Sequence, residues 1–313
     1  MKIKVWLIPI IILLIIAALA FFPVTVTHIE TIASNFDNTY RHLNNLNEWQ
    51  KWNPELKKIC SSNCQKEMVQ EGKLRQVIFY NANDSIVVTK PIPLSYNIDG
   101  FVSNHFISYN LIIVPSSSNN SLQVQSTEKL KLFHYLFNSS SSHGQSALSA
   151  LKNFLEDTKN LYGFPIKTEK VIDTVFAVVN CTTDSAHLFT VLNKNFKRLD
   201  TYVQQHQLEK KGFYSVSYSA EQDSLHLILG IPVNKFATAS GDIHCVNIPK
   251  GIMLTGFYEG KFLKKQVIYR AFMRYATDHF KENVGAPFES YINNQLPPSD
   301  TSTVQFKFYY PVR

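Results

Sequence analysis

The chain has little cysteine, glycine or charge, and each shortage excludes a class of protein. Four Cys in 313 residues exclude a disulfide-dense scaffold, because such scaffolds are short and rich in Cys. The 11 Gly exclude a collagen-like repeat. Charged residues make up 18% and hydrophobic residues 45%, which excludes a disordered chain or a coiled coil. The length predicts two domains, each stabilised by its own packed core.

The common catalytic motifs are also absent. The sequence contains no Gly-x-Ser-x-Gly, no phosphate-binding Walker loop, no dinucleotide fingerprint and no His-Glu-x-x-His. The 10 His are dispersed, and the net charge of +7 comes from scattered Lys and Arg rather than a basic block. We therefore expect no cofactor, no metal and no nucleic-acid partner. These absences favour a protein that is not an enzyme.

One long apolar run stands at the start of the chain. Val5 to Phe22 contains no charged residue and follows Lys2 and Lys4, and at 1.5 Å per residue it is just long enough to cross about 30 Å of hydrocarbon. We predict a single-pass transmembrane anchor over residues 1–23, with the N-terminus cytoplasmic and the body extracytoplasmic. A cleaved signal peptide is the alternative, because Ala18-Leu19-Ala20 resembles a cleavage site.

Two of the cysteines are close in sequence. Cys60 and Cys64 lie in a polar stretch, where we predict a small disulfide loop, since a zinc site needs about four such ligands. Cys181 and Cys245 lie in apolar segments and are expected to be buried as small hydrophobic residues.

Residues 24–163 show the pattern of a strand, a helix, a series of strands and a long helix. Alternating or β-branched segments predict an antiparallel meander between residues 74 and 133, and the apolar spacing from Ala147 to Tyr162 predicts one helix over 145–162. With the Trp-x-x-Trp-x-Pro motif of Leu46–Pro54, this pattern resembles the SRPBCC family, which is START-like and polyketide-cyclase-like. The resemblance implies a helix-grip domain around a ligand cavity. Trp49 and Trp52 would either line the mouth of that cavity or pack in the core.

Gly163-Phe164-Pro165 predicts a domain boundary, because Gly and Pro together end helices. Residues 166–313 then repeat the order strand, helix, strand, strand, which predicts an α+β domain with pseudo-twofold symmetry. The expected elements are strands at 170–181, 213–218, 224–232, 242–248, 252–258, 287–293 and 304–312, and helices from Asp184 to His206 and over 260–282.

Several ordered motifs in this half resemble the gyrase-inhibitor-like effector-binding domain, a small-molecule-binding module of transcription activators. The motifs are Gly241-Asp242-Ile243, Ile248–Gly251, Gly256–Gly260, Gly285–Tyr291 and Phe308–Val312. No DNA-binding helix-turn-helix accompanies them. Residues 24–163 and the apolar run occupy its place.

The resemblance implies that Glu289 is a pocket carboxylate that pairs with cationic, aromatic ligands. Strand alternation puts Glu289 and Tyr291 on one face, and a buried carboxylate without a partner is relieved by an incoming cation. The role requires that no internal Lys or Arg pairs with this carboxylate. The aromatic residues expected as walls are Tyr214, Tyr218, Phe257, Tyr258 and Tyr291.

The sequence therefore favours a membrane-anchored protein that binds an apolar or cationic amphipathic small molecule without catalysis. One alternative is a hydrolase in which Glu289 and Tyr291 activate water. The other is a structural or partner-binding envelope protein with closed cavities. Lys261, Lys264, Lys265, Arg270 and Arg274 are expected on the solvated face of the second helix.

Overall fold

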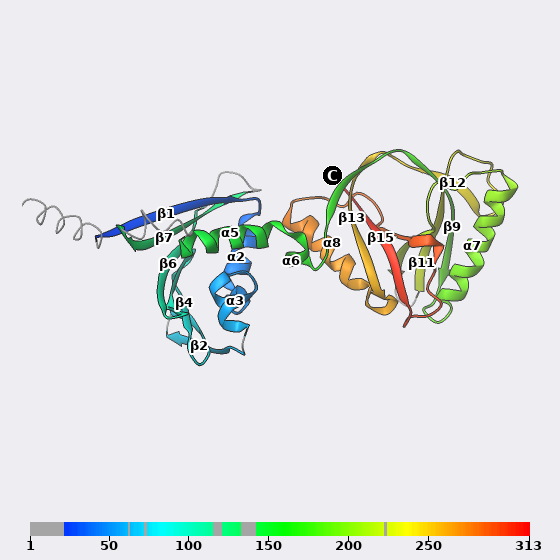
Figure 1. Cartoon of the computed structure of the whole chain (residues 1–313). Helices are drawn as coiled ribbons and strands as arrows, with labels where there is room; N and C mark the ends of the chain where they lie inside the picture. Colours follow the sequence, from blue (N-terminus) through cyan, green and yellow to red (C-terminus); the bar gives the residue numbers. More distant parts are fainter. Residues whose placement is uncertain (1–21, 62, 72–73, 115–120, 133–141, 222–223) are drawn as a thin grey trace, which may run out of the picture. The chain divides into compact units, whose positions relative to one another are not determined.

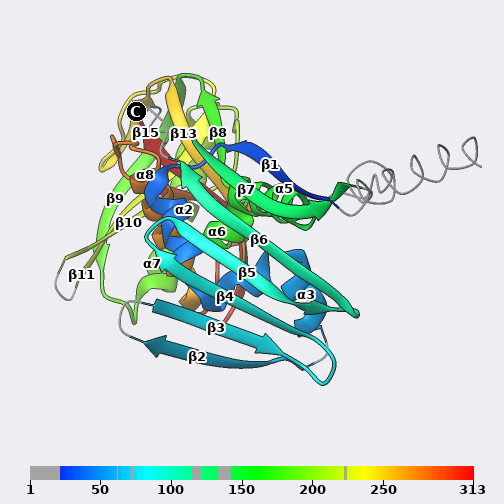
Figure 2. The same cartoon turned by 90° about the vertical axis from the view of Figure 1, so that its left-hand side faces the viewer.

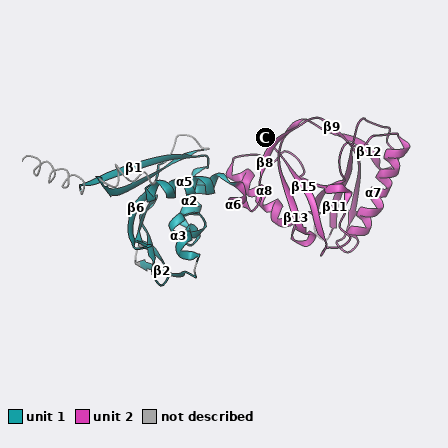
Figure 3. Cartoon of the chain, viewed as in Figure 1, with its two compact units in different colours: residues 1–157 teal, residues 158–313 magenta. Residues whose placement is uncertain are grey.

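The structure is a computed structural model that describes residues 22–61, 63–71, 74–114, 121–132, 142–221 and 224–313. The chain divides into unit 1, Met1–Asp157, and unit 2, Thr158–Arg313 (Figure 3). Apart from Phe22 and Pro23, the predicted anchor lies outside the described residues. Within the described ranges, no helix combines the length and apolarity needed to span a bilayer.

Unit 1 is built on one antiparallel sheet with the strand order β1-β7-β6-β5-β4-β3-β2 (Figure 2). Three helical segments, α2, η1 and α3, separate the first strand from the meander. The strands are β1 (Pro23–Ile32), β2 (Gln65–Glu71), β3 (Leu74–Tyr80), β4 (Ser85–Ile92), β5 (Ser95–Val102), β6 (His105–Val114) and β7 (Leu122–Lys131), and the helices are α2 (Phe36–Asn44), η1 (Leu46–Lys51), α3 (Pro54–Cys60) and α5 (His143–Glu156).

Helix α5 packs against β1, β7 and β6 (Figure 1). Ser142 begins it by accepting a hydrogen bond from the Gln145 amide at 3.1 Å, as an N-cap residue does. Its buried side chains lie on one face and include Leu148, Leu151 and Leu155. The helix ends at Glu156 because Asp157 is extended, with φ −90° and ψ 108°. The predicted single helix over 145–162 is therefore wrong: residues 158–162 form a separate helix in unit 2.

Trp49 and Trp52 lie in the core of unit 1. They are 0% and 1% exposed, and their ring centroids are 4.8 Å apart. The Trp49 indole donates to the Leu43 carbonyl at 2.9 Å, and its ring also contacts Tyr96. The prediction that these rings line the mouth of a cavity is corrected, because burial of this extent is that of core packing.

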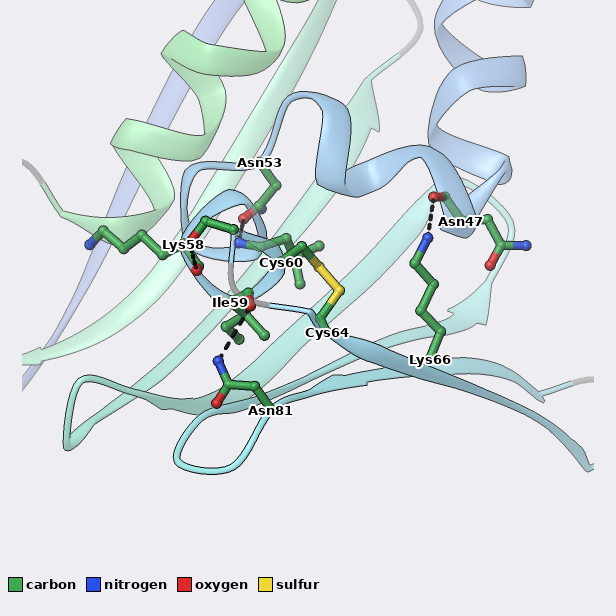
Figure 4. Close-up of a disulfide and its surroundings, with 10 residues drawn as sticks. Asn47, Asn53, Lys58, Ile59, Cys60, Cys64, Lys66 and Asn81 are labelled. Carbon is green, nitrogen blue, oxygen red and sulfur yellow. Dashed lines mark hydrogen bonds between the residues drawn. A yellow bond between two sulfur atoms is a disulfide. The ribbon is translucent and has the colours of Figure 1, made fainter.

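Cys60 and Cys64 form a disulfide between the end of α3 and the start of β2 (Figure 4). Asn53 caps α3 by accepting from the amides of Glu55 and Leu56, and Pro54 occupies the first helical position. The side chain of Asn81 donates to the Ile59 carbonyl at 3.3 Å. The disulfide and the Asn81 hydrogen bond connect the short helix to the segments beside β2 and β3.

Unit 2 contains one antiparallel sheet in the order β12-β9-β11-β10-β14-β15-β13-β8. Its strands are β8 (Lys167–Val171), β9 (Thr174–Thr183), β10 (Ser215–Glu221), β11 (Ser224–Val233), β12 (Ile243–Ile248), β13 (Gly251–Lys261), β14 (Phe288–Tyr291) and β15 (Thr303–Val312), and its helical segments are α6 (Thr158–Tyr162), α7 (Leu188–Gln205), η2 (Phe262–Lys264), α8 (Gln266–Asp278) and η3 (Ile292–Asn294).

The two β-α-β-β units expected from the sequence are β9-α7-β10-β11 and β13-α8-β14-β15. Each forms half of the sheet, and the halves meet where β10 pairs with β14, at Ser215 with Ser290 and Val216 with Glu289. The expected strand over 170–181 is in fact two strands, β8 and β9. The expected helix over 260–282 begins later, at Gln266, because β13 extends to Lys261 and η2 follows it.

Candidate functional site

The candidate site lies where the two halves of unit 2 meet. On β14, alternation places Glu289 and Tyr291 on one face of the sheet and Phe288 and Ser290 on the other. Glu289 has no exposed surface, and its neighbour across the central pairing is Val216 of β10. The carboxylate is therefore fixed by the middle of the sheet rather than by a loop.

Two tyrosine hydroxyls donate to this carboxylate. Tyr269 of α8 donates to Oε1 at 2.6 Å, and Tyr291 of β14 donates to Oε2 at 2.6 Å. The hydroxyl of Tyr218 lies 3.1 Å from that of Tyr291. Because Tyr291 gives its only hydroxyl proton to Glu289, Tyr218 is the donor in this second bond. The result is a chain from Tyr218 through Tyr291 to the carboxylate.

Lys265 supplies a positive charge to the same group. Its Nζ lies 2.7 Å from Oε1 of Glu289, and its side chain is 7% exposed. The ammonium also stands 3.3 Å from the ring centroid of Tyr218 and 4.1 Å from that of Phe262. Among the described residues, no other acceptor atom contacts Nζ.

This pair corrects two predictions. Lys265 does not belong to the solvated face of a helix, because it lies at the turn between η2 and α8 and points inward. Glu289 is not a carboxylate waiting for a cationic ligand, because the chain supplies its own cation. The requirement stated for cation capture is not met.

The buried charges shift the pKa values of their neighbours. Burial lowers the pKa of Lys265 to about 8, against the attraction of Glu289, which raises it. Burial and the negative charge of Glu289 raise the pKa of Tyr218 and of Tyr269. The same two causes raise the pKa of Tyr291. These tyrosines are therefore neutral donors throughout the physiological range.

A pocket of about 910 Å³ opens above Lys265. We call it the lysine pocket. Its walls come from the start of α7, from β10, from η2 and from the first turn of α8. Its lining includes Phe189, Tyr218, Ala220, Phe262, Lys265 and Tyr269. Lys265 lines the pocket whereas Glu289 does not, so the ammonium separates the pocket from the carboxylate.

Of the six residues predicted for a site in residues 166–313, Glu289, Tyr291 and Tyr218 come together and the other three do not. Phe257 is 46% exposed and faces away from the core. Tyr258, its neighbour on β13, is buried and stacks on Phe306, but its hydroxyl donates to the Lys261 carbonyl. Tyr214 stacks on Phe196 of α7 and donates to Asp200. None of these three lines the lysine pocket.

The opposite face of the sheet carries a second, smaller pocket of about 370 Å³. Phe288 and Ser215, which point away from Glu289, contribute to it together with apolar residues of β11, β12 and β13. It holds no charged side chain except Lys250. Of the two pockets, only the lysine pocket is therefore lined by a buried charged residue.

No family model and no curated protein matches this chain. It is similar to the C-terminal domain of EcmrR over 48% of this chain and 98% of that one, with 15% identity and a TM-score of 0.41. It is similar to a hydrolase from Listeria innocua over 47% and 91%, with 10% identity and a TM-score of 0.36. It is also similar to SAV2435, in a structure with bound tetraphenylphosphonium, over 47% and 93%, with 9% identity and a TM-score of 0.31. At such identities, the ligand of this chain is inferred from its own side chains.

Proposed function

We propose that unit 2 is a small-molecule-binding module of the gyrase-inhibitor-like type, and that its lysine pocket holds the apolar body of an amphipathic ligand. The observation that carries this proposal is an open pocket of about 910 Å³ with Tyr218, Phe262 and Tyr269 in its walls. Ligand sites are typically concave and aromatic, with a few polar groups at fixed positions. Here the polar group is the ammonium of Lys265.

The geometry supports binding better than the two alternatives. Hydrolysis requires Glu289 to reach a bound molecule, yet this carboxylate is fully buried and already accepts from Tyr269 and Tyr291. A purely structural role predicts a closed groove above the charged residues. The volume of the lysine pocket argues against that role.

Titration calorimetry with the neutral probe 2-naphthylethanol tests this function. Ala220→Trp places a large ring in the lysine pocket, and Ser219→Trp places the same ring on the other face of β10, at an exposed position. We expect the full chain to bind with a Kd of about 1 mM or lower, Ala220→Trp to lose at least about tenfold in affinity, and Ser219→Trp to bind as the wild type does. Absence of wild-type binding, or equal binding by both variants, would overturn the proposal.

For unit 1 we propose the helix-grip type. Its sheet places β1 beside β7, and α5 packs against β1, β7 and β6, which supports that assignment. Because Trp49 and Trp52 are buried in the core, we assign them no ligand.

We also propose that the apolar run Val5–Phe22 anchors the chain in the membrane, with both units on the extracytoplasmic side. Lys2 and Lys4 before the run support this orientation, and the Cys60–Cys64 disulfide suits an oxidising compartment. We expect the protein to stay in the membrane pellet after alkaline carbonate and to be digested by protease added outside intact cells. Release into the supernatant, or digestion only after lysis, would overturn it.

A further inference from the structure

We propose that the lysine pocket selects an acidic ligand, with a carboxylate of the ligand bound to the ammonium of Lys265. This inference rests on the proposed function and adds the charge of the ligand to it. The sequence predicted a ligand of the opposite charge, a cation that pairs with Glu289.

The order of the two charges, seen from the pocket, carries the argument. A molecule in the pocket meets Lys265, which is part of the lining, and does not reach Glu289, which has no exposed surface. The ammonium has three N–H donors, and its ion pair with Glu289 is the one contact it makes with an acceptor among the described residues. The N–H groups that face away from Glu289 are buried donors without an acceptor, which is costly, so an incoming acceptor is stabilised.

A cationic ligand cannot use the aromatic faces beside Glu289, because the Lys265 ammonium already contacts them. Aromatic faces attract cations within about 6 Å of the ring centroid, and the rings of Tyr218 and Phe262 both lie within that range of the Lys265 ammonium. A second cation would be repelled by Lys265 and would have no access to Glu289. The chain thus occupies its own cation site.

The charges that face Lys265 allow an anion to bind. The titratable groups around the ammonium are Glu289, Tyr218 and Tyr269, and the other charged side chain of the pocket lining is Asp300, which is exposed. Lys265 and Glu289 cancel each other, so the floor of the pocket is neutral overall and an added carboxylate gains a charge-assisted hydrogen bond. With a pKa of about 8, Lys265 is mainly protonated at pH 7.

Three probes that share one ring system and differ in charge test the proposal: 2-naphthylacetate, 2-naphthylethanol and (2-naphthylmethyl)trimethylammonium. With the full chain at pH 7, calorimetry is expected to show the carboxylate binding about tenfold tighter than the alcohol, as one hydrogen bond to a charged group provides. The ammonium probe is expected to bind weaker than the alcohol. Above pH 8 the preference for the carboxylate should decline.

Two variants separate the role of Lys265 from that of positive charge in general. Lys265→Met with Glu289→Gln removes the whole pair without leaving a lone buried charge, and we expect it to bind the carboxylate and the alcohol within about threefold of each other. Lys264→Met removes an exposed charge one residue away and should keep the wild-type order. Circular dichroism establishes that both are folded.

The outcomes distinguish this inference from the function beneath it. If no probe binds, the alcohol included, the proposed function fails. If the alcohol binds and the ammonium probe binds tightest, or if the double variant keeps the preference for the carboxylate, the function stands and the acidic-ligand inference is overturned.

Discussion

The ammonium of Lys265 stands 2.7 Å from Oε1 of Glu289, and the two side chains are 7% and 0% exposed. The residues come from different elements of unit 2: Lys265 from the turn before α8, and Glu289 from the central strand β14. An ion pair so far from water gains stability only while both members are present, because each compensates the desolvation of the other.

Breaking this pair is expected to cost far more than removing it. Lys265→Met and Glu289→Gln should each lower the free energy of unfolding by about 3–5 kcal/mol. The double variant should lose much less than the sum, since two neutral side chains of similar volume leave no buried charge. Denaturant unfolding of the four proteins gives the coupling energy directly.

Lys307 and Glu169 provide a matched control for this experiment. Their atoms are 2.8 Å apart, but their side chains are 36% and 38% exposed. Removing either member should change the free energy of unfolding by at most about 1 kcal/mol. Additive effects at Lys265 and Glu289 would contradict the burial of the pair.

The sequence predicted the strands around this site correctly, but it did not predict that a lysine lies beside Glu289. Alternation along β14 correctly placed Glu289 and Tyr291 on one face, because the period of a strand is fixed. Lys265 was misplaced because the helix was expected to begin at residue 260, whereas β13 and η2 delay it to Gln266. Because the helix begins six residues later than expected, different side chains face inward. No local pattern shows that a Lys before the helix pairs with a Glu on a strand much later in the chain.

The aromatic walls show the same limit. Tyr218 was expected at the site and lines the pocket, while the sequence did not single out Phe262 and Tyr269, which also line it. Phe257 was expected at the site but is 46% exposed on the other face of β13. The alternating pattern of a strand is the same whether an aromatic residue lies in the core, in a pocket or at the surface. Only the tertiary structure distinguishes these positions.

The Cys60–Cys64 disulfide is expected to make a modest contribution to unit 1. The two residues are 4 apart in sequence, and closing so short a loop restricts the unfolded chain by only about 2 kcal/mol. Replacing both by Ser should lower the denaturation midpoint of unit 1 accordingly and leave unit 2 unchanged. Dithiothreitol should lower the denaturation midpoint of unit 1 in the wild type by the same amount, because it reduces this disulfide. It should leave the midpoint of the double variant unchanged.

The contribution of the Glu55–His143 pair to the free energy of unfolding is expected to be bell-shaped as a function of pH. Nδ1 of His143 lies 3.0 Å from Oε1 of Glu55. This contact lowers the pKa of Glu55 and raises that of His143 from their ordinary values of 4.5 and 6.5. The contribution is therefore fully present between those two values. It is lost as the pH rises through the raised pKa of His143, and as it falls through the lowered pKa of Glu55.

We expect His143→Gln to cost about 0.5–1 kcal/mol between pH 4.5 and 6.5, since the imidazole is partly exposed, and less on either side. Unfolding measured from pH 3 to 9 checks this. His187→Gln removes a similar contact to Asp184 in which both side chains are well exposed, and it should leave the profile unchanged. A His143→Gln effect that does not vary with pH would contradict the pair.

Glu128 is expected to destabilise unit 1 at neutral pH. It is 4% exposed, and its Oε2 accepts a long hydrogen bond of 3.4 Å from the Gly144 amide at the start of α5. Burial raises its pKa above 4.5. The folded state thus keeps this proton at a pH where the unfolded state has lost it, and stability falls as the pH rises from 4.5 through the raised pKa.

Glu128→Gln cannot ionise and should escape that loss. At pH 7 we expect the melting temperature of unit 1 to exceed that of the wild type by about 2–4 °C, which corresponds to about 1 kcal/mol in a unit of this size. At pH 4, where the wild-type side chain is protonated, the two should coincide. Glu67→Gln, at an exposed position on the edge strand β2, should show no such difference at either pH. Equal melting temperatures of Glu128→Gln and the wild type at pH 7 would mean that the Glu128 carboxylate finds better solvation than its burial implies.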